Sequence, residues 1–119
     1  MAAPNLKSPT TITGRTKTYS ATTTLSEVLA NPAASNKSFK INSLYCANID
    51  GATTTDVSIV IRTGATDRYL AKTIAIPPDA TQLIVTREGY IYLEEGMSIW
   101  AQANADNDVD ITIGYEEIA

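Results

Sequence analysis

The chain has 119 residues, a net charge of −4 and a hydrophobic fraction of 44%, which suits one globular domain. Its nine Lys and Arg residues are scattered, so it lacks the basic stripe with which nucleic-acid-binding proteins displace counterions. No apolar run approaches the about 20 residues of a transmembrane helix, and the N-terminus has no apolar segment typical of a secretory signal. We therefore expect no nucleic-acid partner and no membrane association.

Residues 1–10 contain two prolines and little to bury, which predicts an extended N-terminal arm ahead of a single domain over residues 11–119. The first expected strand, Thr11–Ser20, is polar and rich in Thr, a β-branched residue that suits a half-exposed strand. The next segment, Thr22–Leu29, is ambiguous because its apolar residues have helical spacing while its Thr run favours extended chain. We interpret it as a strand or a single helical turn that ends before Pro32.

The rest of the chain alternates short apolar runs of period 2 with turn residues, a pattern typical of consecutive antiparallel strands. The fold class predicted is therefore all-β: an antiparallel, jelly-roll-like β-sandwich of eight or nine strands with the extended N-terminal arm. The pattern does not specify strand order, so a true jelly roll and an immunoglobulin-like arrangement both stay open. The further strands are expected at residues 38–49, 57–62, 68–76, 82–87, 90–93, 97–103 and 109–118.

Alternation within these strands also predicts the core. Cys46 is the single cysteine, so an intrachain disulfide is impossible, and its apolar neighbours predict a buried thiol in preference to a reactive nucleophile. The residues expected to fill the core are Phe39, Ile41, Tyr45, Val57, Ile59, Ile61, Leu70, Ile74, Leu83, Val85, Ile91, Leu93, Ile99, Ala101, Val109, Ile111 and Ile113.

The chain has no histidine, which removes the usual general base, zinc ligand and triad member. Two carboxylate pairs, Glu94-Glu95 and Glu116-Glu117, offer the two acids of a glycosidase, but adjacent strand residues point to opposite faces. The six glycines are isolated and form no phosphate loop. We expect a protein that is not an enzyme, with no catalytic residue, cofactor or metal.

The segment Asp106–Asp110 offers oxygen ligands at alternate positions, which calcium accepts, but it lacks the Gly and the distal Glu of an EF-hand loop. An Asx-rich hairpin tip is the preferred interpretation, with a weak calcium site as the alternative. Tyr90 and Tyr92 share a strand face and form either a binding patch or a half-buried ladder. Trp100 is interpreted as a core or interface anchor in preference to a sugar-stacking platform.

Three segments carry a resemblance to a known family: Tyr-Leu-Ala-Lys-Thr-Ile-Ala-Ile-Pro-Pro-Asp-Ala (69–80), Ile-Tyr-Leu-Glu-Glu-Gly-Met-Ser-Ile-Trp-Ala-Gln-Ala (91–103) and Ile-Thr-Ile-Gly-Tyr-Glu-Glu-Ile (111–118). Together with residues 11–16 and 47–51, they resemble small virion structural proteins of tailed bacteriophages, especially those of marine and cyanobacterial hosts. The resemblance implies a sandwich or jelly-roll unit in many copies on the particle, as a capsid decoration (cement) protein or a neck or tail component. It supplies no active-site residues.

From the resemblance we expect a decoration protein that binds the major capsid protein and stabilises the shell, and that associates with copies of itself as a trimer or another symmetric oligomer. After synthesis in the host cytoplasm it would occupy the outer capsid surface of the virion, because an acidic protein is repelled from packaged DNA. The alternatives are a neck, tail or fibre component, or a carbohydrate-binding sandwich for host attachment. The expected partner-binding residues are Pro4, Asn5, Leu6, Lys7, Ser8 and Pro9 of the arm, with Tyr90, Tyr92 and Trp100.

Overall fold

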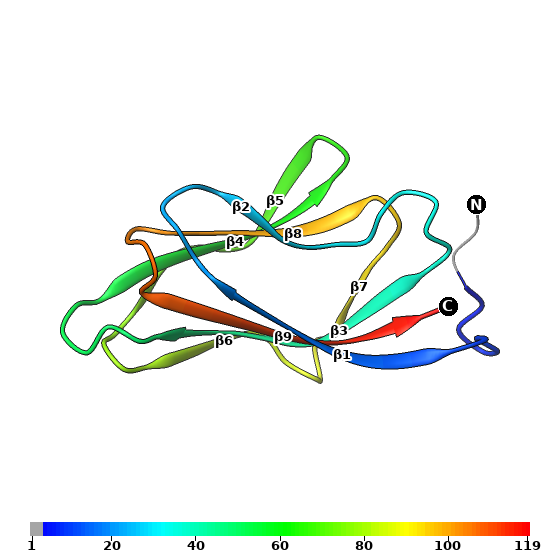
Figure 1. Ribbon diagram of the computed structural model, residues 1–119, viewed down its shortest axis with the longest axis horizontal. Coiled ribbons are helices and arrows are strands. Elements are labelled where there is room, and N and C mark those ends of the chain that lie inside the picture. Colours follow the sequence, from blue (N-terminus) through cyan, green and yellow to red (C-terminus); the bar gives the residue numbers. More distant parts are fainter. Residues whose placement is uncertain (1–3) are drawn as a thin grey trace.

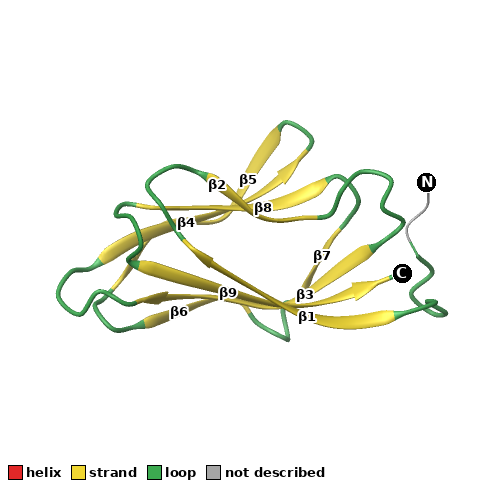
Figure 2. Ribbon diagram, viewed as in Figure 1, coloured by secondary structure: helices red, strands yellow, loops and turns green. Residues whose placement is uncertain are grey.

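The computed structural model describes residues 4–119 and consists of two antiparallel β-sheets packed face to face (Figures 1 and 2). No helix occurs within these residues, and hence none that is long and apolar enough to cross a membrane. The prediction of an all-β sandwich is confirmed. The nine strands are β1 (Ile12–Ser20), β2 (Ser26–Ala30), β3 (Ser38–Asn48), β4 (Thr55–Thr63), β5 (Thr66–Ile76), β6 (Thr81–Val85), β7 (Ile91–Leu93), β8 (Met97–Ala103) and β9 (Val109–Ile118).

The first sheet, here called the β9 sheet, has the order β1-β9-β3-β6, and β7 pairs with β3 beside β6. The second, the β8 sheet, has the order β2-β8-β4-β5. The chain crosses between the sheets after β1, β2, β3, β5, β7 and β8, so most consecutive strands lie in different layers (Figure 1). This order is jelly-roll-like and differs from the immunoglobulin arrangement, whose sheets are ABED and CFG.

Apolar side chains from both sheets meet in one core. Ile41, Leu44, Ile59, Ile99 and Ile113 are fully buried, and each such side chain stabilises the fold by about 1.5–3 kcal/mol relative to exposure. Most of the predicted core is confirmed, with Ile61, Ile74 and Ile91 packed against it and partly exposed. Cys46 is fully buried, as predicted, and burial raises the pKa of its thiol to about 12, so the thiol stays protonated.

Tyr45 is a wrong core prediction, and a β-bulge is the cause. The register between β3 and β9 shifts between Ile41 and Ser43, which adds one residue to β3 and reverses the facing of every later side chain. Leu44 and Cys46 are therefore buried while Tyr45 is half-buried on the outer face.

Leu70 and Leu83 are also wrong core predictions: they are 38% and 53% exposed. Leu70 is an extra residue in β5, because the register steps from Ile59↔Ala71 to Val60↔Tyr69, and Ala71 takes the buried position. Leu83 pairs with Tyr45 and shares its outward orientation.

Two buried asparagines tie the layers together at opposite ends of the sandwich. Asn31 Nδ2 donates to the main-chain oxygens of Lys37 and Leu93, each at 2.9 Å. Asn48 Nδ2 donates to those of Thr53 and Ile76, also at 2.9 Å. A buried amide that satisfies several main-chain groups is costly to remove, because those groups would otherwise be buried without partners.

We predict that Ile59→Ala lowers the free energy of unfolding by about 2–5 kcal/mol, because the side chain is fully buried between the sheets and truncation leaves a cavity. Urea denaturation followed by the fluorescence of Trp100 measures this loss. Leu83→Ala is the matched control and should change stability by less than about 0.5 kcal/mol, since Leu83 is exposed. Equal losses in the two variants would contradict the assigned core.

Candidate partner-binding surface

The N-terminal arm is anchored to the end of β9. The main-chain nitrogens of Thr10 and Thr11 donate to the Ala119 oxygen at 2.7 and 3.1 Å, and Ala119 N donates to Thr11 O at 2.9 Å. Before this anchor, Asn5 organises a turn: its main-chain oxygen accepts from Ser8 N and its Oδ1 accepts from Lys7 N, both at 3.0 Å. The arm therefore has a defined path beside the C-terminus (Figure 1).

The arm meets the β9 sheet at Tyr92. Pro4 and Leu6 line a shallow pocket of about 220 Å³ together with Ser38, Tyr92 and Glu94. Two of the six predicted arm residues thus lie beside one of the predicted aromatic residues. Leu6 is 49% exposed, so an apolar side chain stands at the rim of this pocket, while Asn5, Lys7 and Ser8 face solvent and Pro9 is half-buried.

Tyr90 and Tyr92 pack edge to face, with ring centroids 5.6 Å apart and an interplanar angle of 84°. Lys40 of β3 pairs with Tyr92 across the strands and places its Nζ 4.3 Å from the centroid of Tyr90. The three side chains form a cation–aromatic cluster on the outer face of the β9 sheet. Tyr90 stays 45% exposed, so the cluster presents an aromatic surface to solvent.

Trp100 lies in the other sheet, and its ring is covered by a cation. The guanidinium of Arg62 lies 3.7 Å from the ring centroid and forms two hydrogen bonds with Asp67, at 2.6 and 3.1 Å. Trp100 Nε1 donates to Ser98 Oγ at 2.8 Å. Val60, the cross-strand partner of Trp100, is fully buried yet lies outside the main core.

The three predicted aromatic residues do not form one platform, because Trp100 and the two tyrosines lie in different sheets. A sugar-binding platform needs an open ring face, and Arg62 covers one face of Trp100. The cations that contact Tyr90 and Trp100 are Lys40 and Arg62, which lie on neighbouring strands. Period-2 alternation in the sequence does not show which strands are neighbours.

Glu117 joins two cations near the end of β9. Its carboxylate accepts from Arg15 Nε at 2.8 Å and from Lys37 Nζ at 2.6 Å. Hydrogen bonding to Lys37, and then to Arg15, lowers the pKa of this carboxyl from its ordinary 4.5. Glu116 instead accepts from Asn42 Nδ2 at 3.2 Å on the other face, so this carboxylate pair diverges, as predicted.

The Asp106–Asp110 segment uses its oxygens within the fold. Asp106 Oδ1 accepts from Thr23 N at 2.7 Å, and Asn107 Oδ1 accepts from Ser20 Oγ at 3.2 Å. Asn107 has the left-handed backbone, with φ of 64°, that Asn tolerates in turns. Among residues 4–119, no group of three or more His, Cys, Asp or Glu side chains is arranged to hold a metal ion. The geometry is that of an Asx-rich hairpin tip.

The two ends of the sandwich differ in charge. The loops 21–25, 49–54, 77–80 and 104–108 meet at one end, where Ile49 N donates to Asp108 O at 2.8 Å and Asn107 N donates to Ala21 O at 3.0 Å. These loops contain four Asp and neither Lys nor Arg. The opposite end holds the arm and the loops 31–37 and 94–96, where Lys7 and Lys37 are accompanied by Glu94 and Glu95 (Figure 1).

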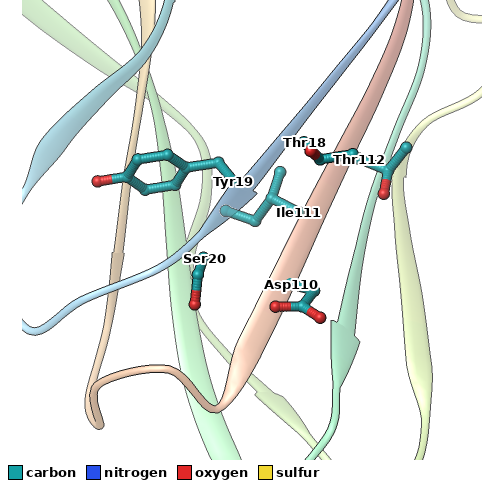
Figure 3. A pocket seen from close by; sticks show the side chains of 6 residues that line it. All are labelled: Thr18, Tyr19, Ser20, Asp110, Ile111 and Thr112. Atoms are coloured by element: carbon teal, nitrogen blue, oxygen red, sulfur yellow. The ribbon is translucent and has the colours of Figure 1, made fainter.

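β1, at the edge of the β9 sheet, is the most exposed of the nine strands. Eight of the nine β1 residues are exposed, although β1 pairs with β9 over its whole length without a register shift. Figure 3 shows Thr18, Tyr19 and Ser20 of β1 beside Asp110, Ile111 and Thr112 of β9, which line a shallow pocket of about 350 Å³. Sequence reasoning missed this surface, because it identified a polar strand but not its place at an edge.

The chain has only distant similarity to known proteins. No protein-family model matches the chain, and no curated protein matches it. Two solved structures of a pentameric capsid protein isolated from metagenomic phage sequences share 16% identity with it, at a TM-score of 0.44 in both cases. The match covers 87% of this chain and 60% and 61% of those chains, so this chain spans about three fifths of their length.

We predict that Glu117 stabilises the protein in a pH-dependent way. Because its pKa is lower in the folded state than in the unfolded state, its contribution is complete well above pH 4.5 and is lost as the pH falls through the folded pKa. Both cations are largely exposed, at 52% and 41%, so the contribution is about 1 kcal/mol. The stability gap between the wild type and Glu117→Gln, measured by urea denaturation, should be widest above pH 4.5 and should close as the pH is lowered below it. Glu88→Gln is the control, because Glu88 takes part in none of the salt bridges among residues 4–119.

Proposed function

We propose that this chain is a non-enzymatic structural protein of a bacteriophage virion, and that it acts as a capsid decoration or cement protein. In this role it binds the major capsid protein on the outer surface of the shell and stabilises the shell, together with other copies of itself. The fold alone does not determine this role, because one fold serves many functions. The resemblance of residues 69–80, 91–103 and 111–118 to phage virion proteins is the second support for it.

The observation that carries the proposal is the jelly-roll-like strand order, β1-β9-β3-β6 facing β2-β8-β4-β5. Double-sheet jelly rolls are typical of viral capsid proteins, lectins and cupins. A lectin would need converging aromatic and polar groups, whereas Trp100 lies on the opposite sheet from Tyr90 and Tyr92. The virion role is therefore favoured over the carbohydrate-binding alternative.

The two ends of the sandwich carry different residues, and this difference supports one orientation on the shell. The end with the Asp-rich loops favours a position away from packaged DNA, because like charges repel. The opposite end bears the arm, with exposed Leu6, and the Tyr90–Tyr92–Lys40 cluster. Exposed aromatic and apolar side chains at the centre of a surface are typical anchors of protein interfaces, so we assign the arm end to contact with the capsid.

Copy number tests the role. We expect hundreds of copies of this chain per particle, measured by quantitative mass spectrometry of purified virus particles against isotope-labelled peptide standards. About six to twelve copies, as expected from ring symmetry, would place the chain in the neck or tail and overturn the decoration role. Complete absence from the particles would overturn the virion role as a whole.

We further predict that deletion of residues 1–9 weakens attachment to the shell while the sandwich stays folded, because the bonds between Thr11 and Ala119 remain. Co-sedimentation with particles depleted of this protein measures attachment, and urea denaturation measures folding. The control variant Thr54→Ala keeps the whole arm and changes an exposed residue at the opposite, Asp-rich end. Unchanged attachment after the deletion would refute the role of the arm.

A further inference from the structure

β1 is the one long and regular open edge among the strands of residues 4–119. The other edges are short or irregular: β2 has five residues and a register shift, β6 has five residues, β7 has three, and β5 has two shifts. Within β5, Thr73 has a left-handed φ of 53°. Short length, bulges and charged side chains are usual means by which proteins prevent edge strands from pairing with other chains. β1 is neither short nor bulged, and its one such feature is the charge of Arg15 and Lys17.

The free main-chain groups of β1 can be assigned residue by residue. Just beyond its two ends, Thr11 and Ala119 exchange main-chain hydrogen bonds, and Ala21 N donates to Val109 O at 2.9 Å. Hydrogen-bonded and non-bonded pairs alternate in an antiparallel ladder, and the β1–β9 register is continuous. The odd-numbered residues of β1 therefore bond to β9. The residues that direct their N–H and C=O groups to the open edge are Ile12, Gly14, Thr16, Thr18 and Ser20.

β1 itself carries two cations, Arg15 and Lys17, and no carboxylate, in a chain whose net charge is −4. Arg15 and Lys17 lie two residues apart and so share one face of β1. Glu117 is divided between Arg15 and Lys37, and no carboxylate of residues 4–119 lies within salt-bridge distance of Lys17. A strand added at this edge meets both cations side by side.

This charge disfavours a second β1 strand as the added strand. Antiparallel pairing about Thr16 places Arg15 opposite Lys17 of the second copy, and the neighbouring registers place Arg15 opposite Arg15 or Lys17 opposite Lys17. Like charges directly opposite one another destabilise a strand pair, whereas opposite charges stabilise it. The same two side chains therefore repel another β1 strand and attract an acidic one.

We propose that the β1 edge is a strand-accepting site for an extended segment of a different protein, with carboxylates at two alternate positions opposite Arg15 and Lys17. The segment adds to the β9 sheet by main-chain hydrogen bonding to Ile12, Gly14, Thr16, Thr18 and Ser20, as in β-augmentation. This inference rests on the proposed function, because it names the chemistry by which the chain attaches to its neighbour in the particle.

The test measures attachment and amide hydrogen exchange together, on particles depleted of this protein and then incubated with the purified chain. Thr16→Pro removes one outward N–H without removing a bond to β9. We expect it to reduce the affinity at least about tenfold relative to Thr16→Val, which keeps that N–H. Thr18→Pro repeats the comparison at a second outward N–H, and urea denaturation shows that the variants are folded. Lys17→Glu should weaken attachment about tenfold, and Lys17→Gln should weaken it less.

Hydrogen exchange read by mass spectrometry over residues 12–20 separates the outcomes. Attachment with new protection of these amides supports the proposal. Attachment without it, or equal affinity of the Pro and Val variants, overturns the strand-accepting site and leaves the proposed function intact. Attachment unaffected by Lys17→Glu overturns the acidic chemistry of the partner. Protection that appears in the free protein on raising its concentration identifies a second copy as the occupant and overturns the assignment to a different protein. Failure to attach overturns the proposed function, and this inference with it.

Discussion

The fold depends on the need of every main-chain N–H and C=O group in a sheet for a partner. β9 meets this need on both sides, because it pairs with β1 along its whole length and with β3 from Ser38 to Asn48. Its side chains Val109, Ile111 and Ile113 are at the same time buried in the core. One central strand thus links hydrogen bonding to apolar burial, and the unpaired groups are confined to the outer strands, where a partner can reach them.

Bulges set both the core and the edges. In β3 a bulge after Ile41 turns Leu44 and Cys46 inward, and in β5 the extra residue Leu70 turns outward. Alternation in the sequence predicted the strands and most of the core, because period-2 patterning reflects which face is buried. It could not predict these two reversals, because no particular residue type identifies the extra residue of a bulge. One extra residue turns every later side chain of that strand to the opposite face of the sheet.

The candidate surface was predictable only in part. The arm, Pro4 to Pro9, and the tyrosines Tyr90 and Tyr92 were predicted from the sequence, and the structure places the arm beside Tyr92. The cations on Tyr90 and Trp100, Lys40 and Arg62, come from other strands, so these two contacts depend on strand order. The same is true of the β1 edge: Thr11–Ser20 reads as a polar strand, but only the topology shows that its far side has no neighbour within residues 4–119. Strand order arises from long-range pairing, which local patterns do not encode.

A cryo-electron microscopy reconstruction of the intact particle would test the central claim most directly, because it locates the chain and its neighbours at once. The account predicts a jelly-roll-like sandwich on the outer surface of the shell, with its Asp-rich loops directed away from the DNA and the β9 sheet continued at β1 by a strand of another protein. A sandwich placed elsewhere in the particle, or one on the shell with the β1 edge open to solvent, would contradict it.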